Sequence, residues 1–286
     1  TEQRMHALHE LGQDYMRAGL LDRAEALFKE LIDTGPHTVN ALEQLIDIYQ
    51  QEKDWGKAIE TARKLAFKTG KSQDNVIAHY YCELAENEIR SNEQHKAVKY
   101  LKKALATDKK CARASILEGD IHFRTGNLKD AIRAYRRVEE QNTDYITEVL
   151  DKLTQCDQQL DRTDEMIRYL QDMLQRHGGI SVMLALAEVL RERGGDKDAA
   201  EFIASQLENK PSLRGMDRLI DLALIHIKDP AREKLEALKN VTTQLLVNNP
   251  VYQCDVCGFH GKTLHWQCPG CKSWNTVKPI QGVEGE

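Results

Sequence analysis

Large apolar and small residues recur along most of this chain at a spacing of about 34 residues. Each unit carries large apolar residues on one helical stretch and a small residue near the start of the next. That small residue marks the repeat most clearly, as Ala24, Ala58, Ala97 and Ala131. A larger side chain there would push two antiparallel helices apart, so the pattern predicts a stack of closely packed helix pairs.

The first unit contains the fullest version of the motif. Its first helix has large apolar residues, a Leu-Gly pair and an aromatic residue, and its second has alanine, phenylalanine and a closing proline. These residues are Leu8, Leu11, Gly12, Tyr15, Ala24, Phe28 and Pro36. This order is typical of the tetratricopeptide repeat. Later units predict about six repeats within residues 1–212, starting near residues 5, 39, 78, 112, 147 and 181. The fifth unit is the weakest, because Met166 stands where a small residue is expected.

The rest of the chain divides into two parts. Residues 213–247 are expected to form one more amphipathic helix pair that closes the stack, with an internal boundary at Asp229-Pro230. A connector without a packing role is the alternative. Asn248-Asn249-Pro250 ends the helix and starts a small module at residues 251–286. Between repeats, residues 70–74 predict a longer loop. The expected fold class is all-α: a tetratricopeptide-repeat superhelix with a small C-terminal module.

A curved stack of helix pairs offers a concave surface lined by the first helix of each pair. Such a surface lacks the convergent polar groups that an enzyme requires, so we expect protein binding and no catalytic residue. A scaffold without a groove function is the alternative. Arginine occupies the thirteenth position in four units, as Arg17, Arg90, Arg124 and Arg193. These arginines are candidates to bind carboxylates of an acidic partner, although helix-end arginines also cap terminal carbonyl groups.

Composition narrows the class of partner. The 286 residues are 30% charged and 41% hydrophobic, which describes a soluble folded protein. Lys and Arg number 40 against 45 Asp and Glu, and the net charge of -5 gives no reason to expect nucleic acid as a partner. The strongly apolar stretch Leu219 to Ile227 is far shorter than the ~20 residues of a membrane span. The chain begins at Thr1 inside a predicted helix, so we expect an excised fragment.

The seven cysteines fall into two groups. Cys82, Cys111 and Cys156 stand singly in helical sequence and are expected to be small core residues. The remaining four form two Cys-x-x-Cys motifs, Cys254, Cys257, Cys268 and Cys271. Two residues between paired cysteines let both sulfur atoms reach one ion from a single tight turn.

This double motif predicts one tetrahedral metal ion, either structural zinc or a single iron. A closed shell of four thiolates leaves no position for a substrate, so a catalytic metal is not expected. Gly258 and Gly270 are expected to permit the backbone geometry of the two turns. Two disulfides are the alternative, which a reducing compartment disfavours.

A module of 36 residues is too small to support its own core, so metal coordination must supply much of its folding free energy. We therefore expect the module to dock on the helical stack and to be coupled to it. Its aromatic residues are expected to cover the metal-binding turns and the last helices instead of stacking on bases. They are Tyr252, Phe259, Trp266 and Trp274.

The module resembles the paired metal-binding turns of rubredoxin. The resemblance rests on Tyr252-x-Cys254-x-x-Cys257-Gly258-Phe259 and on Cys268-Pro269-x-Cys271. The ten-residue interval between the two motifs is much shorter than in true rubredoxins. Repeats followed by such a module, which ends in Trp274-Asn-Thr-Val-Lys-Pro-Ile280, resemble the lipopolysaccharide assembly protein B family of Gram-negative bacteria. This resemblance covers essentially the whole chain.

The resemblance implies a non-enzymatic adaptor on the cytoplasmic side of the bacterial inner membrane. Such a protein promotes degradation of the deacetylase LpxC by the membrane-bound AAA+ protease FtsH, and it organises other lipopolysaccharide assembly proteins. An N-terminal membrane anchor is expected outside this chain. The four cysteines carry over as metal ligands, with iron as the family's usual metal. The alternative function is a rubredoxin-type electron carrier with a protein-docking repeat domain, although the short interval lacks the insertion that shields a redox iron.

Overall fold

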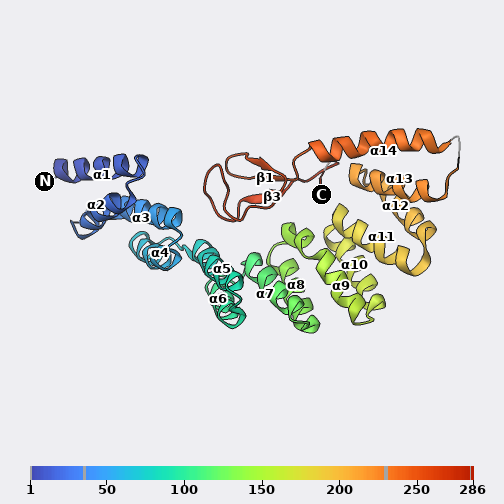
Figure 1. Cartoon of the computed structure of the whole chain (residues 1–286), viewed down its shortest axis with the longest axis horizontal. Helices are drawn as coiled ribbons and strands as arrows, with labels where there is room; N and C mark the ends of the chain where they lie inside the picture. The colour runs from blue at the N-terminus through green and yellow to red at the C-terminus, as the bar shows by residue number, and fades with distance from the viewer. Residues whose placement is uncertain (1, 35–36, 229–230, 284) are drawn as a thin grey trace. The chain divides into compact units, whose positions relative to one another are not determined.

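The computed structural model describes residues 2–34, 37–228, 231–283 and 285–286. The described chain is helical up to residue 248 and ends in a small three-stranded sheet. Contacts divide it into two compact units, residues 1–114 and 115–286. Helices follow one another as packed pairs within each unit (Figure 1). The predicted all-α repeat fold with a small C-terminal cysteine module is confirmed.

Helix pairs build the first unit. They are α1 (Glu2–Arg17) with α2 (Leu21–Thr34), α3 (Thr38–Glu52) with α4 (Trp55–Thr69), and α5 (Asp74–Arg90) with α6 (Gln94–Thr107). The repeated alanines Ala24, Ala58 and Ala97 are completely buried. A Cβ atom on Gly12 would lie 2.7 Å from Cζ of Phe28, so the Leu-Gly position lets the aromatic ring pack against the backbone of α1. Close approach of the paired helices therefore explains both kinds of small residue.

The loop predicted at residues 70–74 lies between α4 and α5. Gly70 has a left-handed φ of 68° and its N–H donates to the carbonyl of Ala66 at 2.9 Å, which ends α4. Helix α5 begins at Asp74. The closing proline of the first repeat, Pro36, lies outside the described residues.

The second unit contains most of α7 and the helices that follow it. Helix α7 (Ala112–Arg124) crosses the boundary between the units. It is followed by α8 (Leu128–Gln141), η1 (Thr143–Glu148), α9 (Leu150–Gln159), α10 (Thr163–His177), α11 (Ile180–Gly194) and α12 (Asp196–Asn209). Ala131 is fully buried, and Met166, which replaces the small residue in the weakest repeat, is only 1% exposed. The methionine therefore fits inside the stack.

The short 3-10 helix η1 interrupts the regular pairing. The side chain of Asn142 accepts a hydrogen bond from the N–H of Asp144 at 3.0 Å and starts η1. Tyr145 and Ile146 within it are buried. The repeat start predicted near residue 147 falls inside this element, and α9 is only ten residues long. This irregular element provides a contact surface for the C-terminal module, which Tyr145 contacts.

Helices α13 (Leu213–His226) and α14 (Ala231–Asn248) come last, and part of their interface is polar. Lys239 on α14 donates to Asp217 at 2.7 Å and to Asp221 at 2.6 Å on α13. The boundary predicted at Asp229-Pro230 lies outside the described residues. Among the described helices, none is both long and apolar enough to span a bilayer.

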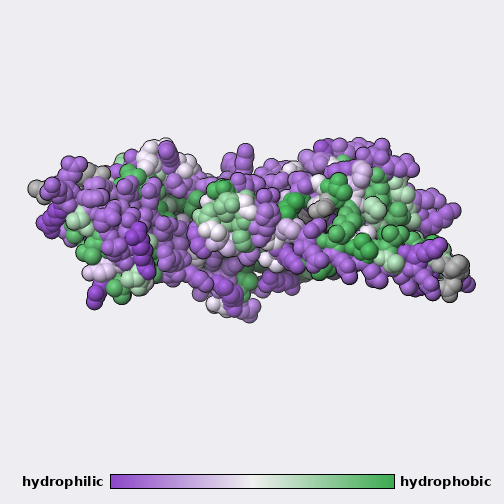
Figure 2. Space-filling model, turned by 90° about the horizontal axis from the view of Figure 1, so that it is seen from above, coloured by the Kyte–Doolittle hydropathy of each residue, from purple (hydrophilic) through white to green (hydrophobic). Residues whose placement is uncertain are grey.

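Helix α14 also leaves apolar side chains exposed. Leu238, Val241 and Leu245 are 54%, 54% and 48% exposed, and their spacing places them on one helix face. Figure 2 shows hydrophobic side chains gathered over the C-terminal helices on the face drawn there. The end of the helical stack therefore presents an apolar surface to solvent.

Candidate metal centre

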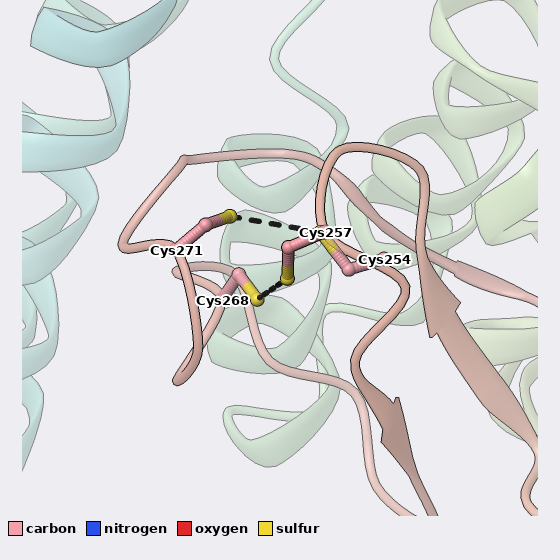
Figure 3. A group of neighbouring side chains, drawn as sticks. All are labelled: Cys254, Cys257, Cys268 and Cys271. Atoms are coloured by element: carbon pink, nitrogen blue, oxygen red, sulfur yellow. Dashed lines mark hydrogen bonds between the residues drawn. The ribbon is translucent and has the colours of Figure 1, made fainter.

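The four cysteines lie in two matching turns of the C-terminal module (Figure 3). Its strands are β1 (Tyr252–Cys254), β2 (His260–Gly261) and β3 (Val277–Pro279), paired antiparallel in the order β2-β1-β3. In the first turn, the N–H of Gly258 donates to the carbonyl of Cys254 at 2.9 Å. In the second, the N–H of Lys272 donates to the carbonyl of Cys268 at the same distance. The backbone therefore repeats itself at the two Cys-x-x-Cys motifs.

The sulfur atoms are close enough to share one ion. All four Sγ atoms lie within 4.8 Å of one another. The Sγ atoms of Cys254 and Cys271 are 3.8 Å apart, and those of Cys257 and Cys268 are 3.6 Å apart. A tetrahedral ion with metal–sulfur bonds of ~2.3 Å requires sulfur separations of about 3.8 Å. The donor set and its spacing therefore fit one zinc or iron ion, and the geometry favours neither metal.

Hydrogen bonds favour the thiolate form of two ligands. Burial acts to raise the pKa of Cys254, but hydrogen bonds with Thr276 and with the N–H of Cys257 outweigh it and lower the pKa to about 6. The side chain and N–H of Ser273 lower the pKa of Cys271. The backbone bonds come from residues two or three positions after each of these two cysteines.

Cys257 shows the opposite shift. The N–H of Phe259 acts to lower its pKa, but desolvation and hydrogen bonds with Cys268, Cys271 and Cys254 raise it to about 11. Hydrogen bonds therefore raise the pKa of Cys257 while they lower those of Cys254 and Cys271. A bound cation favours all four thiolates together, so metal binding and thiol deprotonation are linked.

The two glycines of the turns have different structural roles. This corrects the expectation that both permit the backbone geometry of the turns. Gly258 has a positive φ of 73° as expected. In the second turn the corresponding position is Lys272, with a φ of 61°, and Gly270 is not among the described residues with positive φ. A Cβ on Gly270 would lie 3.2 Å from Sγ of Cys257. Gly270 therefore gives the sulfur room instead of giving the backbone freedom.

The module docks on η1 within the second unit. The hydroxyl of Tyr145 donates to the side-chain oxygen of Asn275 at 2.8 Å and lies 3.2 Å from the carbonyl of Val277. Its ring centre is 4.7 Å from that of Trp266. Tyr145 is fully buried, so this contact is a small shared core between η1 and the module. The expected docking is present, and Trp266 packs against Tyr145 of η1.

Polar contacts surround this shared core. Lys278 forms an ion pair with Asp144 at 3.1 Å, and its amine lies 4.4 Å from the ring centre of Tyr145. The hydroxyl of Tyr252 donates to Glu148 at 2.5 Å, and burial followed by this bond raises the Tyr252 pKa. Both ends of η1 are therefore joined to the module.

A second attachment lies at Glu286, which sequence reasoning missed. Its carboxylate accepts from the N–H of Ser181, at the start of α11, at 3.0 Å, and it pairs with Arg214 on α13. The N–H of Leu213 donates to the carbonyl of Val283 at 2.8 Å. No motif marks these residues, because the partners are far apart in the chain.

The four candidate partner-binding arginines all lie exposed in the last turns of first helices. Their helices are α1, α5, α7 and α11 for Arg17, Arg90, Arg124 and Arg193 respectively. Arg17 pairs with Asp14 at 3.3 Å, and Arg193 pairs with Asp164 of α10 at 2.6 Å. The arginines belong to two units, so a common acidic partner remains a prediction.

The three other cysteines are free and buried, as the core interpretation requires. Sγ of Cys82 lies 3.9 Å from Sγ of Cys111. Burial raises the pKa of Cys156 to about 11, so this thiol stays protonated at neutral pH.

Comparison with known proteins identifies the family to which the chain belongs. A relative in Escherichia coli strain K12 named lipopolysaccharide assembly protein B is 39% identical, in an alignment that covers 99% of this chain and 73% of the relative. The chain belongs to the lipopolysaccharide assembly protein B family. A Haemophilus influenzae relative of the same name is 33% identical and is covered to 72% of its length.

Two family patterns match parts of the chain. Residues 252–279 match the family described as rubredoxin metal binding domain, and residues 9–74 and 82–145 match tetratricopeptide repeats. The first match contains all four cysteines. This member of the lipopolysaccharide assembly protein B family therefore combines the two parts that its sequence predicted.

Solved structures give weaker likenesses. PilF of Pseudomonas aeruginosa is 16% identical with a TM-score of 0.35, over 87% of this chain and 94% of that one. A crystal structure of MamA protein is 17% identical with a TM-score of 0.33, over 73% and 92%. Scores of this size support no argument about function.

Proposed function

We propose that this chain is a non-enzymatic adaptor that regulates lipopolysaccharide synthesis at the cytoplasmic face of the inner membrane. It promotes FtsH-dependent proteolysis of the deacetylase LpxC and organises other assembly proteins. Membership of the lipopolysaccharide assembly protein B family is the observation that carries the proposal. Helix pairs of the tetratricopeptide type, which commonly bind proteins, support it.

The proposed organisation follows the sequence. Residues 1–212 form the repeats, residues 213–247 close them, and residues 251–286 form the metal module. We infer from the family resemblance that the full-length protein has an N-terminal membrane anchor. The proposal gives the helical repeats the task of binding proteins and the module the task of completing the second unit.

We assign one metal ion to Cys254, Cys257, Cys268 and Cys271, with iron expected from the family resemblance and zinc as the other candidate. Their sulfur spacing supports this assignment. When bound, the ion supplies cross-linking of the two turns. The residues around it hold the sulfurs through backbone N–H groups and join the module to η1.

The electron-carrier alternative makes a different prediction for the purified protein. A carrier requires a coloured iron centre that bleaches and recovers reversibly on reduction and oxidation. An adaptor requires only that the ion stays bound. Reversible cycling at a physiological potential with a reductase partner would replace the adaptor proposal.

The arginines give the adaptor proposal a second, finer test. We assign Arg17, Arg90, Arg124 and Arg193 to binding of an acidic partner segment. Charge reversal at Arg17, Arg90 and Arg124 should weaken partner capture, more at low salt than at high salt, without changing helicity. Arg193 already pairs with Asp164, so its reversal is a less direct test. Equal capture by the variants would remove the arginines from the proposed surface.

The function itself is tested in cells that lack their own lipopolysaccharide assembly protein B. The full-length protein that carries this chain is expressed there, and the half-life of LpxC is measured after protein synthesis is stopped. We expect rapid loss of LpxC when the protein and FtsH are both present, and persistence when either is missing. An LpxC half-life that does not depend on the protein would contradict the proposal.

A further inference from the structure

Phe67 is exposed to an unusual degree. It lies on α4 and is 88% exposed, whereas the next most exposed large hydrophobic residue of the described chain, Val256, is 63% exposed. Phe28, by contrast, is fully buried. A side chain as large as phenylalanine normally contributes to a core or an interface. The exposure of Phe67 therefore indicates a surface that binds a partner.

A hollow lies beside Phe67 in the first unit. It has a volume of about 300 Å³ and is formed by the end of α2, the start of α3 and the second half of α4. We call it the Phe67 hollow. Its lining consists of Ile32, Thr38, Leu42, Arg63, Lys64, Phe67 and Lys68. Pockets for whole small molecules measure about 300–1,000 Å³. The Phe67 hollow is at the lower limit and suits one large apolar side chain.

Positive charge surrounds the apolar lining. Arg63, Lys64 and Lys68 are exposed, and the described residues that line the hollow include no acid. Among the side chains that the structure describes, neither Lys64 nor Lys68 forms an ion pair. Lys57, about two turns before Lys64 on the same helix, differs because it pairs with Asp54 at 3.0 Å and with Glu25 at 3.8 Å. The exposed lysines beside Phe67 therefore give the edge of the hollow a positive charge that suits an anionic partner.

We propose that the Phe67 hollow binds an acidic peptide segment of another protein, anchored by one large apolar side chain. The anchor enters the hollow and contacts Phe67, while flanking carboxylates face Lys64 and Lys68. The hollow beside the exposed Phe67 ring favours a peptide over a membrane surface, because it has room for one large side chain whose neighbours in the same peptide reach Lys64 and Lys68. The inference concerns only the first unit, so it holds whether or not FtsH and LpxC are partners and whichever metal the module binds.

The test uses the purified chain and short fluorescent peptides. The first peptide has a central leucine with aspartate and serine alternating on both sides. A second has serine at the centre, and a third has lysine in place of every aspartate. Vesicles rich in phosphatidylglycerol report membrane binding. Binding is measured by fluorescence anisotropy or co-sedimentation at low and high salt.

We expect the chain to bind the acidic leucine peptide, and binding to weaken at high salt because exposed charges are screened. Phe67→Ala and the double variant Lys64→Glu/Lys68→Glu should each raise its Kd about tenfold. The serine-centred and lysine peptides should bind at least about tenfold more weakly. The matched double variant Lys99→Glu/Lys102→Glu changes two exposed lysines of α6 and should leave the Kd within about twofold.

Three results would overturn the inference. One is no binding of the acidic leucine peptide at concentrations up to about 1 mM. Another is equal binding by wild type, Phe67→Ala and Lys64→Glu/Lys68→Glu. The third is vesicle binding that requires Phe67 without any peptide binding, which would make the surface a membrane contact. Helicity by circular dichroism confirms that each variant is folded, and the exposed positions make folding losses small.

Discussion

The helix pairs and the C-terminal module reach a folded state by different means. In the pair of α3 and α4, apolar residues such as Leu42, Ile48 and Ala58 are buried and supply the core. The module's buried cluster consists of Cys254, Cys268 and Val277, so two of its three members are candidate metal ligands. A repeated apolar pattern is therefore enough for the helices. The module depends on a metal ion and on a surface that another part of the chain provides.

Among the changes that separate the module from the helix pairs, removal of a metal ligand should have the largest effect on stability. Cys257→Ser leaves three thiolates, and the module should lose most of a metal-binding free energy that is about 10–16 kcal/mol in comparable structural sites. Metal content after competition with a chelator measures the loss. Trp266 fluorescence should show exposure to solvent at the same time.

Cys156→Ala is the matched control, because Cys156 is a buried cysteine of α9 outside the module. It should keep one metal ion per chain, although the cavity lowers stability. Wild-type metal affinity in Cys257→Ser would show that the four cysteines are not the ligand set.

The next largest effect should come from the docking surface. Tyr145→Ala deletes a fully buried aromatic ring and should destabilise the second unit by about 3–5 kcal/mol. Tyr145→Phe keeps the ring but removes the hydroxyl bonded to Asn275, at a cost of about 1–3 kcal/mol. Urea unfolding followed by Trp266 fluorescence separates the two. Equal stability of both variants and wild type would mean that the module and η1 are not energetically coupled.

Low pH should destabilise the helical first unit independently of the metal module, because His79 in α5 is a buried titratable group. Burial, followed by the charge of Arg113, lowers the pKa of His79 in α5 to about 3. The unfolded pKa of histidine is about 6.5, so below that pH the unfolded state binds the extra proton. The contribution of neutral His79 to the free energy of unfolding is therefore fully present above pH ~6.5. On going to pH 5, the first unit should lose about 2 kcal/mol of this free energy.

Urea midpoints of metal-free protein measure this loss without a contribution from proton-linked metal release. His79→Gln should have a flatter pH profile between pH 7.5 and pH 5. A wild-type profile in that variant would assign the acid sensitivity to other groups.

The smallest effect should come from the rim of the docking surface. Asp144→Ala removes the ion pair with Lys278. The Asp144 side chain is 40% exposed and that of Lys278 is 17% exposed, so the loss of unfolding free energy should be less than about 1 kcal/mol. The difference from wild type should shrink as salt rises. A larger cost that does not depend on salt would mean that Asp144 orders η1 itself.

Local patterns explain why much of the fold was predictable. Helix pairs follow from apolar spacing and repeated alanines, and the sulfur cluster follows from two motifs within one short segment. Contacts between distant residues left no such pattern. Tyr145 reaches Asn275 across 130 positions, and Glu286 reaches Ser181 across 105. The difference between Gly270 and Lys272 was also hidden, because composition does not reveal which residue of a turn takes the positive φ.

Hydrogen exchange on metal-loaded and metal-stripped protein tests most directly whether the module is a coupled part of the second unit. The account predicts that metal removal abolishes protection in residues 252–279 and lowers it in η1 and at the start of α11, while α1 to α6 keep their protection. Unchanged protection of η1 and α11 in metal-stripped protein, with loss confined to the module, would contradict the coupling.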